Sequence, residues 1–156
     1  MISFGVYEES KLKEKILKAK NYGYSEVFFD LGRVVGNLIK NFDLSDYTLA
    51  YVPLTSRKYF ERGFNQAEVL ALGIKEILNL PLYSGIKKIK ETKDQSELSF
   101  EERKTNLQGA FSLISPPPPK VILIDDIKTT GQTLLEISKI LKQGGAKKII
   151  ALTILR

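Results

Sequence analysis

The sequence predicts an α/β fold in which a mostly parallel sheet is flanked by helices. Two segments with helical periodicity come first, and strands then alternate with helices along the rest of the chain. Near the C-terminus a strand, a helix and a second strand follow one another with short links, which is the βαβ unit of a parallel sheet. The 156 residues, of which 43% are hydrophobic and 27% charged, fit one domain. We expect a single domain over residues 1–156, with a helical N-terminal part at about 1–45 and an α/β core at about 46–156.

Residues 8–41 are expected to form two helices. Apolar side chains gather on one side of the first helix, at Leu12, Ile16, Leu17 and Ala19. The second helix has an apolar stripe at helical spacing from Val27 to Ile39. The five lysines of residues 11–20 fit the solvated side of a helix, and an anion-binding face is the less common alternative.

The middle of the chain begins with a β-rich segment at residues 47–53, which a proline ends. Helical periodicity returns at residues 66–79. Asn65 is the expected N-cap of that helix, and Glu68 has the spacing of a capping box. Residues 82–90 are a weaker strand candidate.

A polar stretch follows at residues 91–106, with one helical turn expected near Ser99 and Glu102. Residues 110–114 have the pattern of a strand. The four consecutive prolines of residues 116–119 cannot lie inside a sheet, because proline donates no ladder hydrogen bond. We expect them to form a stiff surface connector.

The C-terminal part has the clearest pattern. Residues 121–124 form a continuous apolar run, typical of a strand that is buried on both faces. Residues 133–143 are an amphipathic helix, and Gly144-Gly145 suits a left-handed C-cap. Residues 148–154 are a second buried strand, which completes the βαβ unit.

The composition excludes several kinds of chemistry. No cysteine is present, which excludes disulfides, cysteine-bound zinc and thiol catalysis. No histidine is present, so imidazole cannot act as a general base or metal ligand. The net charge of +6 favours anionic partners, although many domains with such an excess bind nothing acidic. No apolar run approaches the roughly 20 residues of a membrane span, and no secretory signal is recognisable, so we expect a cytoplasmic protein.

Polar residues follow the strand of residues 121–124, at the position where parallel sheets bind ligands. The carboxylates of Asp125 and Asp126 can accept hydrogen bonds from a vicinal diol or hold Mg²⁺. The next loop leads into a helix, where backbone N–H groups and the helix dipole favour an anion. Phosphate-binding residues are therefore expected in this loop, at Lys128, Thr129, Thr130, Gly131, Gln132 and Thr133. Acids and loop together describe a site for a ribose 5-phosphate.

Other interpretations explain these residues less well. An ordinary capped turn does not require two acids at the end of a buried strand. A phosphoacceptor receiver domain also has an acidic pair after an apolar strand, but there the pair lies near the start of the domain. The glycine patterns G-x-x-x-x-G-K-[ST] and G-x-G-x-x-G, typical of mononucleotide and dinucleotide sites, are absent from the sequence.

The segment VILIDDIKTTGQT at residues 121–133 closely resembles the phosphoribosyl pyrophosphate (PRPP) signature of type I phosphoribosyltransferases. Motifs in the middle of the chain resemble the ComF/GntX family of such proteins, which is associated with DNA uptake in competent bacteria. These motifs are Val52-Pro53-Leu54, Arg62-Gly63-Phe64-Asn65-Gln66-Ala67, Thr92 with Gln95, Arg103 with Asn106-Leu107, and Gly109-Ala110-Phe111. The resemblance begins at about Lys20 and implies a type I phosphoribosyltransferase-like fold with a small helical hood.

The resemblance also implies a role for each part of the site. Asp125 and Asp126 would be the catalytic residues, holding the ribose hydroxyls and placing Mg²⁺ directly or through water. The loop of residues 128–133 would bind the 5-phosphate. Pyrophosphate would be bound by the loop after the first core strand, through Leu54, Thr55, Ser56, Arg57 and Lys58. Further contacts with an anion or with a closing loop are expected from Arg62, Gln95 and Arg103.

The leading hypothesis is an enzyme, a Mg²⁺-dependent phosphoribosyltransferase that transfers phosphoribosyl from PRPP to an unidentified acceptor and releases pyrophosphate. The alternative is a non-catalytic module on the same fold, which senses PRPP or another nucleotide containing ribose 5-phosphate, or binds single-stranded DNA. Competence proteins and a second copy in a homodimer are further partners left open. Typical family members begin with a cysteine-rich zinc ribbon, which this cysteine-free sequence does not contain.

Overall fold

The protein is built around a parallel sheet, in a computed structural model that describes residues 2–3, 9–91, 107–127 and 130–155. The main sheet has five strands in the order β1-β7-β6-β2-β3, with every neighbouring pair parallel. A second, two-stranded sheet pairs β4 antiparallel with β5. The strands are β1 (Ile2–Ser3), β2 (Thr48–Tyr51), β3 (Leu82–Tyr83), β4 (Ile86–Lys88), β5 (Phe111–Leu113), β6 (Lys120–Ile127) and β7 (Lys148–Leu155).

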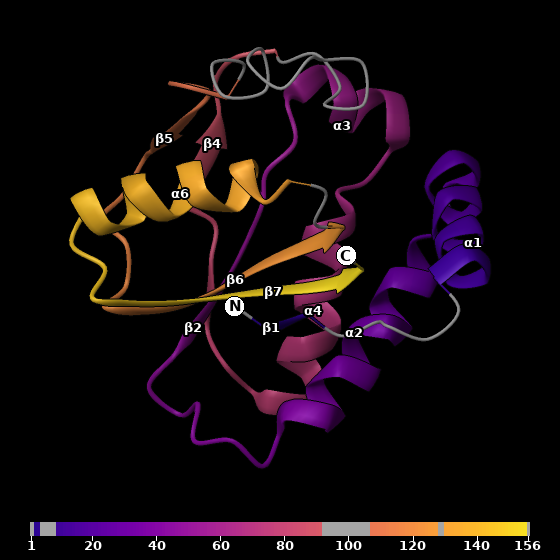
Figure 1. Cartoon of the computed structure of the whole chain (residues 1–156), viewed down its shortest axis with the longest axis horizontal. Helices are drawn as coiled ribbons and strands as arrows, with labels where there is room; N and C mark the ends of the chain where they lie inside the picture. The colour runs from indigo at the N-terminus through magenta and orange to yellow at the C-terminus, as the bar shows by residue number, and fades with distance from the viewer. Residues whose placement is uncertain (1, 4–8, 92–106, 128–129, 156) are drawn as a thin grey trace.

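Helices cover both faces of the main sheet, as Figure 1 shows. The helix α6 (Gln132–Gln143) packs on one face, and α2 (Ser25–Ile39) and α4 (Gln66–Leu78) pack on the other. The first helix, α1 (Glu9–Tyr22), lies at the end of the molecule towards which β6 and β7 run. The predicted α/β architecture with its helical N-terminal part is therefore confirmed.

The central strand β6 explains why both faces of the sheet need a cover. Ile122 and Ile124 point into one core, where Leu70 of α4 is also fully buried. Val121 and Leu123 alternate with them and point into a second core under α6. Successive side chains of a strand face opposite sides, so a run of four apolar residues requires helices on both sides. The apolar run at residues 121–124 is thus a strand buried on both faces, as predicted.

One helix was missed by the sequence prediction. Residues 54–58 were expected to be a loop, but α3 (Ser56–Arg62) begins inside that range. The Thr55 side chain caps the helix by accepting a hydrogen bond from the Lys58 backbone N–H (3.3 Å), and Gly63 ends it with a φ of 78°. No residue of α3 is buried, so the helix has no apolar stripe that periodicity could reveal.

Two further local expectations need correction. The strand candidate at residues 82–90 is two short strands in different sheets, β3 and β4, because the chain turns near the buried Gly85. At the end of α6 the C-cap residue Gly144 is right-handed (φ −76°), and the left-handed conformation belongs to Gly145 (φ 113°). The helical turn expected near Ser99 lies outside the described residues.

The helices α2 and α4 cross at a pair of glycines. A side chain at Gly32 would overlap the carbonyl oxygen of Leu70, and one at Gly73 would overlap the carbonyl oxygen of Phe29. The two backbones therefore approach each other too closely for any Cβ atom. This contact fixes how α2 lies against the core, and the N-terminal helix α1 is joined directly to α2.

Asn65 ties the start of α4 to the end of β2. Its side-chain oxygen accepts a hydrogen bond from the Ala67 backbone N–H (3.0 Å), and its amide nitrogen donates to the carbonyl of Val52 (3.0 Å). The predicted N-cap is confirmed. Glu68, however, accepts a hydrogen bond from the Tyr51 hydroxyl (3.2 Å) rather than closing the predicted capping box. Burial and the adjacent Glu68 carboxylate raise the pKa of Tyr51 to about 12.

Replacing Asn65 with alanine is expected to lower the free energy of unfolding by about 2–4 kcal/mol. The helix would lose its cap, worth about 1 kcal/mol, and the Val52 carbonyl would lose its partner, at a cost of about 1–3 kcal/mol. Urea denaturation of the variant measures the change. Asn65→Asp is the control, because it keeps the cap but not the donor to Val52, and it should fall between the native protein and Asn65→Ala.

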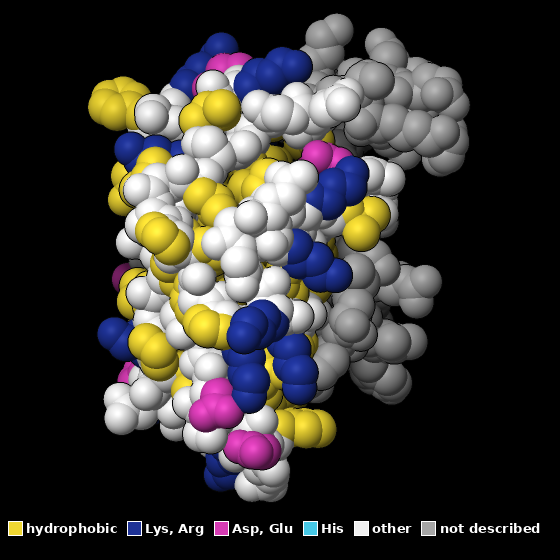
Figure 2. Space-filling view, turned by 90° about the vertical axis from the view of Figure 1, so that its left-hand side faces the viewer, with side chains coloured by type: hydrophobic (Ala, Val, Ile, Leu, Met, Phe, Trp, Pro, Cys, Tyr) yellow, Lys and Arg dark blue, Asp and Glu magenta, His cyan; other side chains and the backbone are white. Residues whose placement is uncertain are grey.

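The end of the molecule where β6 and β7 begin carries basic side chains beside apolar ones, as Figure 2 shows. Lys120, at the start of β6, forms an ion pair with Asp46 (2.7 Å), whose side chain is 72% exposed. Exposed ion pairs of this kind contribute little to stability.

Within the described ranges, no helix is both long and apolar enough to cross a membrane.

Candidate functional site

The two adjacent acids lie near the end of strand β6, at the carboxyl end of the parallel sheet. The Asp125 carboxylate accepts a hydrogen bond from the Asp126 backbone N–H (2.9 Å), and the Asp126 carboxylate accepts one from the Ile127 backbone N–H (2.9 Å). These bonds hold each side chain close to its own strand. Asp125 is partly exposed, whereas only 9% of Asp126 is exposed. The sequence predicted both acids at this strand end.

A lysine from the N-terminal helix reaches this pair. The Lys20 ammonium, in the last turn of α1, forms an ion pair with the second carboxylate oxygen (Oδ2) of Asp126. Their side chains are only 14% and 13% exposed, respectively. Lys18 on the same helix instead pairs with Glu14 (2.7 Å) at the surface, where both side chains are 64% exposed.

Lys20 was not among the predicted site residues. The sequence did contain a signal for it, since Lys20 follows the buried Ile16 by four residues and Ala19 by one. Positions four apart share a helix face, so Lys20 lies beside the apolar face of α1. A lysine in that position can bury its stem and place its ammonium against a partner, unlike the exposed Lys18.

The environment of Asp125 favours its protonated form. Although the residue as a whole is partly exposed, burial of its carboxyl group raises the pKa of Asp125 well above its ordinary value, and the negative charge of Asp126 raises it further. The Lys20 ammonium acts in the opposite direction, and more weakly. The protonated form of Asp125 is thus favoured in the ligand-free protein, and a cation or hydroxyl donor that binds there would favour the carboxylate.

This shift makes a prediction about stability and pH. Because the folded-state pKa of Asp125 lies above the unfolded value, the folded protein binds an extra proton between the two. The contribution of Asp125 to stability is therefore present at low pH and is lost as pH rises through that window. Asp125→Asn should raise the melting temperature at pH 7 and change it less at pH 4, as measured by thermal denaturation at both values. An equal change at the two pH values would contradict this.

The predicted phosphate loop joins β6 to α6, and the structure describes its second half. Gly131 is left-handed (φ 76°) and buried, and α6 begins at the next residue without a side-chain cap. The Thr130 hydroxyl accepts a hydrogen bond from the Gln132 backbone N–H (3.4 Å). Gln132 and Thr133 are partly buried in the first turn. The amino end of α6 thus lies directly after the acidic pair, as an anion site requires. Lys128 and Thr129 lie outside the described residues.

The predicted pyrophosphate residues follow the neighbouring strand. The Val52 backbone N–H donates to the Ile124 carbonyl (2.9 Å), so the segment after β2 starts beside the acidic end of β6. Leu54 and Ser56 line a cavity of about 390 Å³ together with other residues of α3 and β4. Arg57 points elsewhere, since it pairs with Glu61 (2.8 Å) and is 76% exposed. The structure therefore brings the segment to the site, but not the Arg57 guanidinium.

The motif at residues 62–67 combines structural and polar roles. Gly63 ends α3 and Asn65 caps α4, so both residues have structural roles. Arg62 donates a hydrogen bond to the side-chain oxygen of Gln66 (3.3 Å). Gln66 is 3% exposed, and its amide nitrogen has no hydrogen-bond partner among the described residues. Gln95 and Arg103, the other predicted contacts, lie outside those residues.

The oxygen donors at the end of β6 fit Mg²⁺, but only as part of a ligand complex. Among the described residues, no group of three or more acids could hold a metal ion alone. Asp125 and Asp126 offer two carboxylates, which is the usual protein share of a Mg²⁺ site completed by ligand oxygens and water. Mg²⁺ binding is therefore expected to depend on a phosphorylated ligand.

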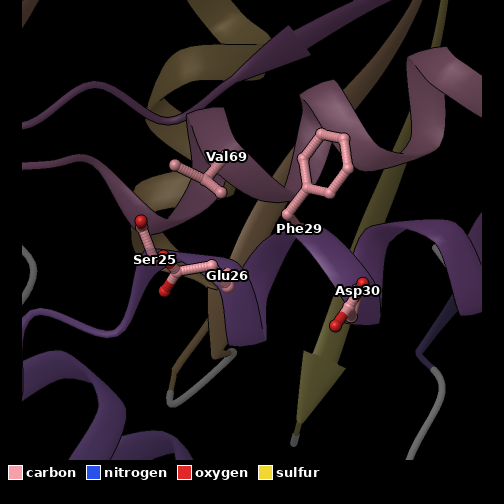
Figure 3. A pocket seen from close by; sticks show the side chains of 5 residues that line it. All are labelled: Ser25, Glu26, Phe29, Asp30 and Val69. Carbon is pink, nitrogen blue, oxygen red and sulfur yellow. The ribbon is translucent and has the colours of Figure 1, made fainter.

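A second cavity of about 370 Å³ lies between α2 and α4 and contains none of the predicted site residues. Figure 3 shows its lining, formed by Ser25, Glu26, Phe29, Asp30 and Val69. The two carboxylates come from exposed positions on α2, so they are solvated rather than poised for chemistry. The site at the end of β6 remains the better candidate.

Comparison with known proteins agrees with this geometry. Residues 61–156 match the family described as "Phosphoribosyl transferase domain". "Competence protein F" of Haemophilus influenzae is 41% identical over 103 residues, covering 63% of this chain and 45% of that protein. "Competence protein ComFC" of Streptococcus pneumoniae is 32% identical over 111 residues, covering 71% of this chain and 49% of that protein. The chain thus spans about half the length of these relatives.

A solved structure supports the fold independently. The allosteric regulatory enzyme of purine biosynthesis superposes with a TM-score of 0.54 at 17% identity, covering 83% of this chain and 25% of that one. At this identity the likeness shows the fold alone. With the acidic strand end, the following helix and the family match taken together, the chain belongs to the phosphoribosyltransferase family, in its ComF-type branch.

Proposed function

We propose that this protein binds PRPP with Mg²⁺ and transfers its phosphoribosyl group to a nitrogen acceptor, releasing pyrophosphate. The observation that carries the proposal is the acidic pair of β6 followed, after a short loop, by the amino end of α6, whose N-cap residue Gly131 has no side chain. In PRPP one ribose ring separates the vicinal diol from the 5-phosphate. The diol needs carboxylate acceptors and the phosphate needs N–H donors, so the two kinds of group have to lie side by side. The cytoplasmic location and the homodimer predicted from the sequence stay predictions.

Each end of the ligand would be held by a different strand end. The first turn of α6 would bind the 5-phosphate through backbone N–H groups and the hydroxyls of Thr130 and Thr133. Asp125 and Asp126 would accept hydrogen bonds from the ribose hydroxyls. The segment from Leu54 to Lys58, beside β6, would bind the pyrophosphate, with the capped first turn of α3 supplying positive dipole charge. Arg57 would have to break its ion pair with Glu61 before it could bind the pyrophosphate.

In the reaction the bond between ribose C1 and the pyrophosphate oxygen breaks, and the electron pair leaves with pyrophosphate. The acceptor nitrogen then forms a bond to C1 and gives its proton to the leaving pyrophosphate or to water. Mg²⁺, when bound with the ligand, would neutralise the leaving pyrophosphate. The protein's own part is to orient the ribose and to place negative charge near the cationic ring, which the buried Asp126 would do, together with Asp125 once the bound ligand and cation favour its carboxylate.

Two measurements on the native chain test the proposal. PRPP with Mg²⁺ should raise the melting temperature, whereas PRPP with EDTA, or Mg²⁺ alone, should not. Pyrophosphate release should then be followed with PRPP and a panel of nucleobases and amines. Release with one acceptor would establish the enzyme, and ligand-dependent stabilisation without any release would favour a PRPP sensor. No stabilisation by PRPP would contradict the proposal.

A second candidate function is single-stranded DNA binding, which one surface of the protein supports. The cavity of about 390 Å³ beside α3 is lined by Tyr59, Phe60, Lys87 and Lys88, and the Phe60 side chain is 90% exposed. Exposed aromatic rings next to lysines suit stacked bases and phosphates. Affinity for an oligodeoxythymidine should fall steeply with salt and fall again in Phe60→Ala. A salt-independent affinity would count against it.

A further inference from the structure

We propose that Lys20 is a gating residue, whose ammonium occupies Asp126 in the ligand-free protein and has to leave when the ligand binds. This inference rests on the proposed function, since it takes Asp126 to be a ligand-binding residue. It concerns the regulation of that site by a helix that precedes the matched residues 61–156.

Lys20 blocks the access of a ligand to the Asp126 carboxylate. One oxygen of Asp126 accepts a hydrogen bond from the Ile127 backbone N–H, and the other pairs with Lys20. The Asp126 side chain is only 13% exposed with Lys20 in this position. A ribose hydroxyl or a cation can therefore reach Oδ2 only after the ammonium has moved.

The positive charge of Lys20 also opposes the binding of a cation at Asp126. The ammonium of Lys20 and a divalent cation would repel each other at a shared carboxylate in a largely buried site, where screening by water is weak. A buried ion pair is also weak evidence for a stabilising role, because both charges lose their hydration. Lys18 shows that a lysine of α1 can satisfy its charge at the surface, with Glu14. The position of Lys20 is thus better explained by the site than by packing.

The helix α1 is anchored to the core beside Lys20. Lys20 lies in the last turn of α1, which Gly23 ends with a φ of 74°. The Tyr24 backbone N–H donates to the Ala19 carbonyl (3.0 Å), which closes this end of the helix. Ile16 and Ala19 are buried and anchor the helix next to Lys20. The Lys20 ammonium can therefore be released by movement of its own side chain while α1 stays on the core.

The test compares Lys20→Met with Lys18→Met in the full chain. Methionine keeps the apolar stem in both and removes only the ammonium. Calorimetric titration with PRPP and Mg²⁺ should show about tenfold tighter binding to Lys20→Met than to the native protein, the change expected when the open state rises from about a tenth of the molecules to nearly all of them. Lys18→Met should bind like the native protein.

Hydrogen exchange gives a readout that does not depend on catalysis. The backbone amides of the last turn of α1 should exchange faster in ligand-free Lys20→Met than in the native protein, and native amides should approach that rate when PRPP and Mg²⁺ are added. A merely structural lysine would also loosen the turn on removal, but its loss would not tighten PRPP binding.

The outcomes separate this inference from the proposed function. Weaker or unchanged PRPP binding in Lys20→Met, with normal binding by the native protein, would overturn the gate and leave the proposed function intact. Binding by Lys20→Met alone would support both. Absence of binding by either protein would overturn the proposed function and the gate with it.

Discussion

Replacing Gly73 with alanine is expected to lower the free energy of unfolding by about 2 kcal/mol or more. The new methyl group would overlap the backbone carbonyl of Phe29 on α2, and a backbone atom cannot rotate away as a side chain can. The helices would have to separate, which typically costs about 1–3 kcal/mol and more where backbone must shift. The better helix propensity of alanine, about 1 kcal/mol, offsets only part of this cost.

Gly36→Ala is the matched control for that effect. Its methyl group would press on the Ile77 side chain, 2.8 Å from its Cβ, rather than on backbone. Urea unfolding should therefore show a clearly smaller loss for Gly36→Ala than for Gly73→Ala. Equal stabilities of the two variants would show that α2 and α4 do not pack as closely as the structure places them.

Asp126→Asn is expected to weaken PRPP binding by about 10- to 100-fold. The amide keeps the oxygen that accepts from the Ile127 backbone N–H, so the strand end should stay folded. It removes the charge that would accept from a ribose hydroxyl, and hydrogen bonds to charged groups are worth about 1.5–3 kcal/mol. Calorimetric titration of the variant with PRPP and Mg²⁺ measures the loss.

The two ends of the buried ion pair should therefore respond in opposite directions. Asp126→Asn and Lys20→Met both break the pair and should both speed exchange in the last turn of α1. Only the aspartate contributes to the ligand, so PRPP binding should weaken in the first variant and tighten in the second. Changes of the same sign in both variants would mean that the ion pair acts on binding through the fold alone.

Much of the fold could be predicted from the sequence because its core obeys simple periods. The run at residues 121–124 is apolar throughout since β6 is covered on both faces, and α2 and α4 repeat apolar residues at helical spacing. Asn65 was recognisable as an N-cap because its residue type and position before the helix both fit. In each case local chemistry and tertiary packing favour the same structure.

Features that depend on contacts distant in sequence could not be predicted in the same way. No residue of α3 is buried, so no periodicity marks the helix, and its start depends on the single cap at Thr55. The ion pair of Lys20 joins residues more than a hundred positions apart, and only the folded sheet brings α1 to the end of β6. Glu68 had the spacing of a capping box, but Tyr51 from a neighbouring strand uses its carboxylate.

The central claim is that the acidic end of β6 binds PRPP together with Mg²⁺. Its most direct test is calorimetric titration of the native protein with PRPP, with and without Mg²⁺, beside Asp125→Asn. That variant is expected to be at least as stable as the native protein at neutral pH, so its loss of binding could not be attributed to unfolding. Our account predicts Mg²⁺-dependent binding by the native protein and a large loss in Asp125→Asn. Equal binding by both proteins, or none by the well-folded native protein, would contradict it.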